Sequence, residues 1–181
     1  PLYKTESQSW WSFDFNRNTV ETTSGYGIYW KYYADRFSIL DNTIKNGQIR
    51  LQELYDAQGQ YEIKRNTLEG NSAKIHFEGY TGQNTNNQNS FTHITHNTIK
   101  NSGQRAIYCE HCYGDVSISH NTVDNSSGDD YSLVIYITEN YPRSLRIDNN
   151  TLQSRANGIS VYNNQGSDNV SKIRRRHTSE L

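Results

Sequence analysis

Short apolar stretches return along this chain with a regular spacing. The dipeptide Asn-Thr followed by Val, Ile or Leu occurs six times, each time with an aromatic or branched apolar residue three positions before the asparagine. The asparagines are spaced by 24, 24, 31, 24 and 29 residues, at Asn18, Asn42, Asn66, Asn97, Asn121 and Asn150. A nearly fixed period with insertions is typical of a solenoid, in which each repeat buries its apolar side by stacking on its neighbours.

Each repeat contains about three short stretches that predict strands. Before the asparagine, two apolar residues alternate with polar ones, as at Phe37 and Ile39. An apolar residue two positions after the asparagine, such as Ile44, begins a second stretch, and another alternating pair follows a polar turn. Alternation with period two predicts strands with one buried face. The third-strand pairs are Ile28 and Trp30, Ile49 and Leu51, Ile75 and Phe77, Ile107 and Cys109, Ile135 and Ile137, and Ile159 and Val161.

The coil length selects the kind of solenoid. A coil of about 24 residues is too long for a hexapeptide left-handed solenoid and lacks the helical periodicity of a leucine-rich repeat. We therefore predict an all-β fold, a right-handed parallel β-helix of about six coils of roughly 24 residues over residues 13–162, with like positions about 4.8 Å apart. Residues 1–12 are expected to form a partial coil or an N-terminal cap, and residues 163–181 a terminal segment or the start of a further coil.

The repeated asparagines have a structural role in such a fold. An inward asparagine at the same bend of each coil can donate its side-chain amide to the asparagine of the next coil and satisfy turn backbone groups. We therefore predict a ladder of six stacked side chains rather than a ligand site, because an identical residue in every coil suits a ladder better than a local site.

Composition excludes several classes of protein. The mean hydropathy is −0.94, but 14 tyrosines and a net charge of −1 do not fit a disordered chain, so the polar excess is expected on a folded surface. Near-neutral charge argues against nucleic acid as a partner. No apolar run reaches the roughly 18 residues of a membrane span, so no membrane partner is expected.

The motif pair Ile-x-x-Asn-Thr-Ile/Val and Gly-Ile-x-Val is clearest at residues 147–152 and 158–161. It resembles the parallel β-helix repeat of carbohydrate-active proteins, which include pectate and alginate lyases, mannuronan epimerases, polygalacturonases and phage tailspike depolymerases. The resemblance implies a polysaccharide partner and an extracellular or phage-virion location. It assigns no active-site residue, because the repeat consists of core and turn positions.

Candidate chemistry lies on the outward face of the third strands, where residues of successive coils should form columns. Two columns combine aromatic, basic and acidic side chains, whereas the column before the asparagines lacks aromatics. One reads Tyr29, Arg50, His76, Tyr108, Tyr136 and Ser160, and the next reads Lys31, Gln52, Glu78, Glu110, Thr138 and Tyr162. Tyrosines offer flat apolar surface with a hydroxyl, which suits pyranose rings.

Catalytic roles follow from these positions. Glu78 and Glu110 in adjacent coils would repel, which provides the acid and base of a glycoside hydrolase, and a separation of about 5 to 5.5 Å would favour retention. A lyase or epimerase would use His76 or Tyr108 as base, with Arg50 neutralising a uronate. Arg50, Tyr29, Tyr136 and Tyr162 are the predicted substrate-binding residues. The alternative is an ordinary solvated surface, with the two glutamates held apart by their loops.

We therefore expect a polysaccharide-acting protein of lyase, hydrolase or epimerase type. The alternative is a non-catalytic receptor-binding or structural segment of a tailspike-like homotrimer, and a third reading is a bare structural solenoid. The longer coils favour a site slightly, because their extra residues at 79–90 and at 128–131 or 139–143 flank the proposed groove.

No metal site or cofactor is predicted, and Ca²⁺ stays open only for a lyase. The single Cys-x-x-Cys pair, Cys109 and Cys112, lacks the second pair of a zinc site, and Cys109 falls in the inward column as a small core residue. Two cysteines are too few for a disulfide-stapled scaffold. His93, His96 and His120 lack carboxylate partners and are poor metal ligands.

Overall fold

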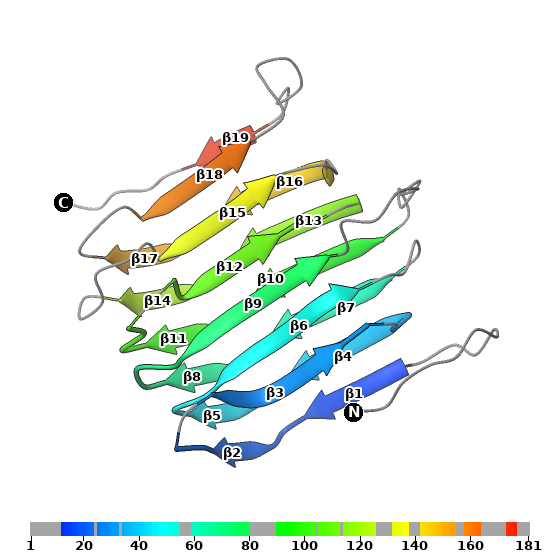
Figure 1. The fold of residues 1–181 in the computed structure, drawn as a ribbon. Coiled ribbons are helices and arrows are strands. Elements are labelled where there is room, and N and C mark those ends of the chain that lie inside the picture. Colours follow the sequence, from blue (N-terminus) through cyan, green and yellow to red (C-terminus); the bar gives the residue numbers. More distant parts are fainter. Residues whose placement is uncertain are drawn as a thin grey trace.

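The computed structural model describes residues 12–23, 25–32, 34–54, 59–79, 90–103, 105–112, 114–125, 132–137, 142–154, 158–163 and 173–176. Within these residues, all regular structure is β-strand, arranged in one seven-stranded and two six-stranded parallel sheets. The strands stack coil over coil from β1 at one end to β18 and β19 at the other (Figure 1). The predicted parallel β-helix is confirmed. The expected extra loops at 79–90, 128–131 and 139–143 fall almost wholly outside the described residues, as do residues 1–11 of the expected cap.

Each coil contributes one strand to each sheet. The first sheet comprises β1 (Ser12–Asn16), β4 (Arg36–Leu40), β7 (Gln60–Lys64), β10 (Phe91–Thr95), β13 (Gly114–Ser119), β16 (Pro142–Asp148) and β19 (Ile173–Arg176). The second comprises β2 (Thr19–Glu21), β5 (Thr43–Lys45), β8 (Thr67–Glu69), β11 (Thr98–Lys100), β14 (Thr122–Asn125) and β17 (Thr151–Ser154). The third comprises β3 (Tyr26–Lys31), β6 (Gln48–Leu54), β9 (Lys74–Gly79), β12 (Ile107–Glu110), β15 (Leu133–Ile137) and β18 (Ile159–Asn163).

The asparagine ladder lies at the bend between the first and second sheets. Asn66 illustrates the pattern: its backbone N–H and its Nδ2 both donate to Asn97 Oδ1 at 3.0 Å, and Nδ2 also donates to the Ile39 carbonyl at 2.8 Å. The same set links Asn42 to Asn66, Asn97 to Asn121 and Asn121 to Asn150. The residue before each asparagine has a φ between 52° and 59°, which makes the bend sharp enough to turn the asparagine inward. The predicted inward ladder is therefore confirmed.

The core is filled by the apolar residues that alternate along the strands. Ile39, Ile63, Ile94 and Ile118 of the first sheet are fully buried, as are their equivalents in the other two sheets. Near the N-terminal end the core becomes aromatic, with the Phe13 and Trp30 ring centroids 4.3 Å apart. Because each coil rests its apolar side chains on the next, the outward face of the third sheet is held on a rigid support.

Two registers in the third sheet differ from the predicted columns. On β15, Leu133 and Ile135 pair with Ile107 and Cys109, so Val134 lies opposite Tyr108, and Tyr136 lies opposite Glu110. The prediction that put Tyr136 beside Tyr108 was wrong by two residues. The run Leu133-Val134-Ile135-Tyr136-Ile137 has an apolar residue at every odd position, so alternation alone fits either register.

The second difference is a β-bulge in β6. The pairing of β6 with β9 shifts between Leu51 and Leu54, where Glu53 has a φ of 51°. Regular alternation would predict Glu53, not Leu54, as the next inward position after Leu51. The bulge lets Leu54 reach the core, and it puts the Glu53 backbone in the left-handed region.

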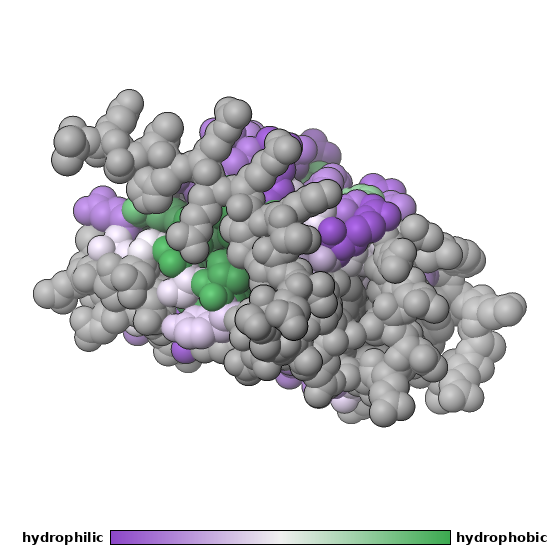
Figure 2. Space-filling view, turned by 90° about the horizontal axis from the view of Figure 1, so that it is seen from above, coloured by the Kyte–Doolittle hydropathy of each residue, from purple (hydrophilic) through white to green (hydrophobic). Residues whose placement is uncertain are grey.

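The end of the solenoid at β18 is seen from above in Figure 2. A small group of hydrophobic atoms lies there between hydrophilic ones. Ile159 of β18 is among the exposed large apolar residues of the described chain. No helix in the described part of the chain is long and apolar enough to cross a membrane.

Candidate functional site

Three neighbouring strands of the third sheet bring the predicted site residues together. The register aligns Arg50 of β6 with His76 of β9 and Tyr108 of β12. Glu78 and Glu110 form the next aligned pair. Their strand neighbours Ile75, Phe77, Ile107 and Cys109 are buried in the core, so these five side chains lie on the opposite, outward face. We call Arg50, His76, Glu78, Tyr108 and Glu110 the central cluster.

His76 and Tyr108 are buried although they lie on the outward face. His76 is 6% exposed and Tyr108 is 9% exposed. Their rings meet edge to face with centroids 4.6 Å apart. Lys74 Nζ and Arg105 Cζ each lie 5.1 Å from the Tyr108 ring centroid, which surrounds the tyrosine with positive charge. The centre of this face is therefore a packed, charged site rather than an open solvated sheet.

The two carboxylates of the cluster approach each other closely. One oxygen of Glu78, one of Glu110 and a ring nitrogen of His76 lie within 4.8 Å of one another. Burial raises the pKa of Glu78, and the negative charge of Glu110 raises it further, against the lowering effect of Arg50. Glu78 therefore retains its proton to a higher pH than an ordinary glutamate, which is the property required of a general acid.

Arg50 and His76 both face the Glu78 carboxylate. Arg50 Nη2 is 3.8 Å from Glu78 Oε2, and His76 Nε2 is 3.7 Å from the same oxygen. Burial lowers the pKa of His76 to about 3, with further contributions from the positive charges of Lys74, Arg50 and Arg105. His76 is therefore neutral near pH 7, and as a proton acceptor it is weaker than an ordinary histidine.

The bulge in β6 adds Glu53 to this surface. Glu53 forms an ion pair of 3.0 Å with Lys31, and its charge contributes to the raised pKa of Glu78. A signal for the bulge is present in the sequence, because Leu51 and Leu54 are separated by two residues instead of one. Lys74 was also missed, although it lies two positions before His76 on the same face of β9.

Exposed tyrosines continue the face toward β3. Tyr26 and Tyr29 stack with ring centroids 4.7 Å apart, and both are nearly half exposed. Tyr29 donates a hydrogen bond to Gln52 at 3.3 Å, and Arg50 Nη1 donates to the Tyr26 hydroxyl at the same distance. A register shift between Tyr26 and Ile28 allows the two tyrosines, three residues apart, to share one face.

On the opposite side of the central cluster, Tyr162 of β18 is exposed, and Tyr136 pairs with it and with Glu110 in the strand register. Tyr29 and Tyr162 thus lie on strands at the two ends of the third sheet, with the central cluster between them. The predicted binding residues therefore follow the direction in which the coils stack.

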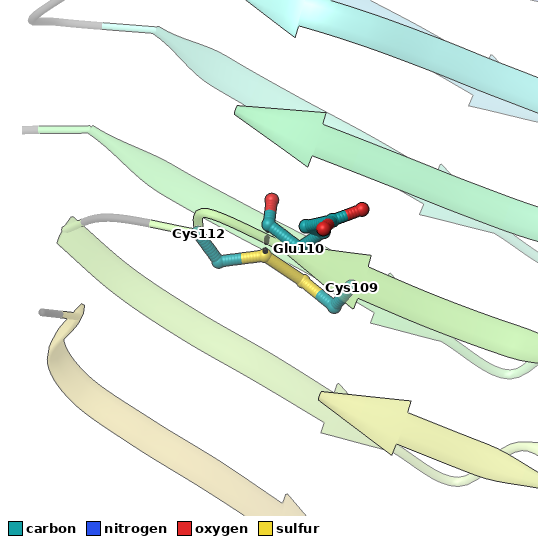
Figure 3. The surroundings of a disulfide bond; sticks show 3 residues. All are labelled: Cys109, Glu110 and Cys112. Carbon is teal, nitrogen blue, oxygen red and sulfur yellow. Dashed lines mark hydrogen bonds between the residues drawn. A yellow bond between two sulfur atoms is a disulfide. The ribbon is translucent and has the colours of Figure 1, made fainter. Parts of the chain in front are cut away.

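A disulfide joins Cys109 and Cys112 around Glu110. Cys109 lies in the core, as predicted, but the bond itself was not predicted from only two cysteines. The Glu110 side chain points away from the sulfur atoms, and Cys112 Sγ lies 3.8 Å from the Glu110 carbonyl oxygen (Figure 3). Between the two cysteines, His111 has a φ of 51°, and its Nε2 is 3.7 Å from Glu110 Oε1. The disulfide therefore closes the turn that follows Glu110.

Comparison with models of known protein families gave no match, and comparisons with curated proteins and with solved structures gave no significant match.

Proposed function

We propose that this protein binds an acidic polysaccharide along the outward face of the third sheet and acts on it at the central cluster. The observation that carries the proposal is the convergence of Arg50, His76, Glu78, Tyr108 and Glu110, with two carboxylates in close approach and positive charges around them. The exposed tyrosines on either side supply flat surfaces for further sugar rings.

The carboxylate pair supports a hydrolase. Glu78, whose pKa is raised, would protonate the leaving glycosidic oxygen, and Glu110 would act from the neighbouring strand as nucleophile or base. Oxygens within 4.8 Å of each other fit the shorter of the two carboxyl separations used by glycosidases, which is the retaining one.

The basic and aromatic residues support a lyase or an epimerase. Arg50 would neutralise the carboxylate of a uronate, and a base would then remove the proton next to it. Tyr108 is the better candidate for that base, because the pKa of His76 is lowered to about 3. His76 would then orient Tyr108 or the sugar rather than take the proton.

A non-catalytic binding module is the second candidate. It is favoured by the stacked and exposed pair Tyr26 and Tyr29, which lies on β3, two strands away from β9. In a tailspike-like homotrimer such a surface would hold a saccharide without cleaving it. This candidate predicts a trimer in solution and binding without product, and a monomer would count against it.

The location is part of the proposal. Disulfides persist mainly in oxidising environments, so the bond between Cys109 and Cys112 supports an extracellular or virion-surface protein. Such a location is where a protein meets polysaccharides of cell surfaces and matrices.

The test is incubation with a panel of acidic and neutral polysaccharides, followed by absorbance near 235 nm for unsaturated products and by a reducing-end assay. A rise in both signals identifies a lyase, and reducing ends alone identify a hydrolase. Glu78→Gln, Glu110→Gln and His76→Ala should each lower turnover. If all three variants keep the wild-type rate on a cleaved substrate, the site is wrongly assigned.

A further inference from the structure

Two buried nitrogens of the central cluster, Arg50 Nε and His76 Nε2, have no hydrogen-bond partner, and the histidine nitrogen is one that can bind a cation. His76 Nε2 is inaccessible to solvent, and more than nine-tenths of the side chain is buried, yet this nitrogen makes no hydrogen bond. A buried polar atom without a partner is destabilising, so a folded protein usually supplies a partner. Glu78 Oε2 lies 3.7 Å from this nitrogen, which is too far for a hydrogen bond but leaves room for an atom between them.

We propose that His76 Nε2, one oxygen of Glu78 and one oxygen of Glu110 bind a single divalent cation of the Zn²⁺ or Mn²⁺ type. A ring nitrogen of His76 and one oxygen of each glutamate lie within 4.8 Å of one another, and Nε2 itself is 3.7 Å from Glu78 Oε2. Zinc binds nitrogen and oxygen at about 2.0 to 2.2 Å, which sets neighbouring ligand atoms about 3 to 3.5 Å apart. Rotation of the two glutamate side chains, which are 18% and 27% exposed, would bring the three atoms to this spacing.

The donor set selects the kind of cation. Imidazole suits zinc and related transition metals, whereas calcium takes six to eight oxygen ligands. Three protein ligands leave a position open for water or for an oxygen of a ligand, as in catalytic rather than structural zinc sites. The cysteines do not compete for the metal, because both are in the disulfide.

Arg50 opposes the cation. Its Nη2 lies 3.8 Å from Glu78 Oε2 and neutralises part of the carboxylate charge. Removing Arg50 should therefore tighten cation binding, whereas removing a ligand should weaken it. This opposite response distinguishes a metal site from a general effect of substitutions on the fold.

The inference goes beyond the proposed polysaccharide activity, because cation binding can be measured without any saccharide. A bound cation would hold both glutamates ionised, and Glu78 could not then act as a proton donor. The cation is therefore expected to inhibit a hydrolase. Cation binding and polysaccharide turnover are measured separately, so the proposed cation site and the proposed polysaccharide activity can each fail without the other.

The experiment is isothermal titration of the oxidised, chelator-treated protein with Zn²⁺, with Co²⁺ absorption as a second readout and Ca²⁺ as the comparison ion. We expect one Zn²⁺ per chain, and an affinity about tenfold or more lower in Glu110→Gln. Arg50→Ala should bind more tightly than wild type, and Ca²⁺ should bind more weakly than Zn²⁺.

The matched control is His120→Ala, which removes an imidazole that stacks on His96 away from the third sheet, with centroids 4.7 Å apart. It should retain wild-type Zn²⁺ affinity. The proposal is overturned if millimolar Zn²⁺ gives no binding, or if His120→Ala loses binding that Glu110→Gln keeps. Glu110→Gln carries the test because His76→Ala, at a buried position, can fail to fold.

Discussion

Asn66 and Asn97 are 31 residues apart in the chain, yet Asn66 Nδ2 donates a 3.0 Å hydrogen bond to Asn97 Oδ1 in the same geometry as pairs 24 residues apart. The longer coil therefore keeps the register of the ladder. In the sequence, its long connection follows β9, the strand that carries His76 and Glu78. The ladder thus keeps the candidate site rigid while the chain next to it varies in length.

The ladder makes a quantitative prediction. Asn97→Ala removes a side chain that donates to the Ile63 carbonyl and to Asn121, and that accepts from Asn66, all within the buried core. Several buried groups lose their partners, so the free energy of unfolding should fall by about 3 kcal/mol or more. Chemical denaturation measures this loss.

The matched control is Asn18→Ala at the exposed end of the same ladder, where the side chain donates to Asn42 and to its own turn. Water can replace these bonds, so the loss there should be about 1 kcal/mol or less. Equal losses at the two positions would contradict the structural role of the buried ladder.

The stability of the metal-free protein should depend on pH through His76. Its folded pKa of about 3 lies below the ordinary 6.5, so the unfolded chain binds a proton that the folded chain does not. The contribution of His76 to the free energy of unfolding is therefore complete above pH 6.5 and is lost as the pH falls toward 3. Between pH 6 and 4 the slope is about 1.4 kcal/mol per pH unit.

Denaturation in the presence of a chelator at several pH values measures this slope, with His76→Gln as the comparison. Carboxylates elsewhere contribute equally to both proteins, so the difference between the two curves reports His76. Parallel curves would show that His76 is not buried in its neutral form.

Glu78 should show a trade-off between stability and activity. The pKa of Glu78 is raised in the folded state, so the folded protein binds this proton more tightly than the unfolded chain does. The free energy of unfolding therefore falls as the pH rises through the range in which Glu78 loses its proton. Glu78→Gln should therefore raise the melting temperature at pH 7 but not at pH 4, while lowering turnover by about 10² to 10⁴.

Glu69→Gln is the matched substitution, because Glu69 is exposed on β8 of the second sheet. It should change neither the melting temperature nor turnover. A Glu78→Gln protein that is less stable than wild type at pH 7 would show that the contact with Arg50 outweighs the desolvation of the carboxylate.

The disulfide should matter more for Glu110 than for the whole fold. Cys109 and Cys112 close a very short loop, for which the chain-entropy model gives about 2 kcal/mol. Reduction should lower the free energy of unfolding by no more than that, while freeing the turn after Glu110 and lowering turnover. The turnover of a Cys109→Ala/Cys112→Ala protein should not respond to reductant. If that protein turned over substrate at the wild-type rate, the disulfide would not be needed to position Glu110.

The fold could be predicted from sequence because its determinants are local and repeated. Each Asn with an apolar residue three positions before it marks one bend, and six copies reinforce one another. The alignment of Glu78 with Glu110, and of Arg50 with His76 and Tyr108, followed from the same count. The alignment of residues that depends only on the repeat spacing can therefore be predicted from the sequence.

The remaining features depend on departures from the period. Tyr136 was assigned to the wrong column because its strand is apolar at every odd position, and the pairing of Val134 with Tyr108 resolves that choice. Glu53 reaches the site only through a bulge. The burial of His76 on an outward face arises from neighbouring side chains such as Tyr108, which strand alternation does not describe.

The central claim, that a saccharide lies along β6, β9 and β12, is tested most directly by comparing two arginine substitutions. Arg50 lies on this face, whereas Arg65 pairs with Asp41 at the bend before the asparagine ladder. Equilibrium binding should be measured with the acidic polysaccharide that wild type binds best. We predict that Arg50→Ala lowers the affinity about tenfold or more, because it removes one charged hydrogen bond to the saccharide. Arg65→Ala should leave the affinity unchanged. Equal affinities in the two variants, or a loss confined to Arg65→Ala, would contradict the claim.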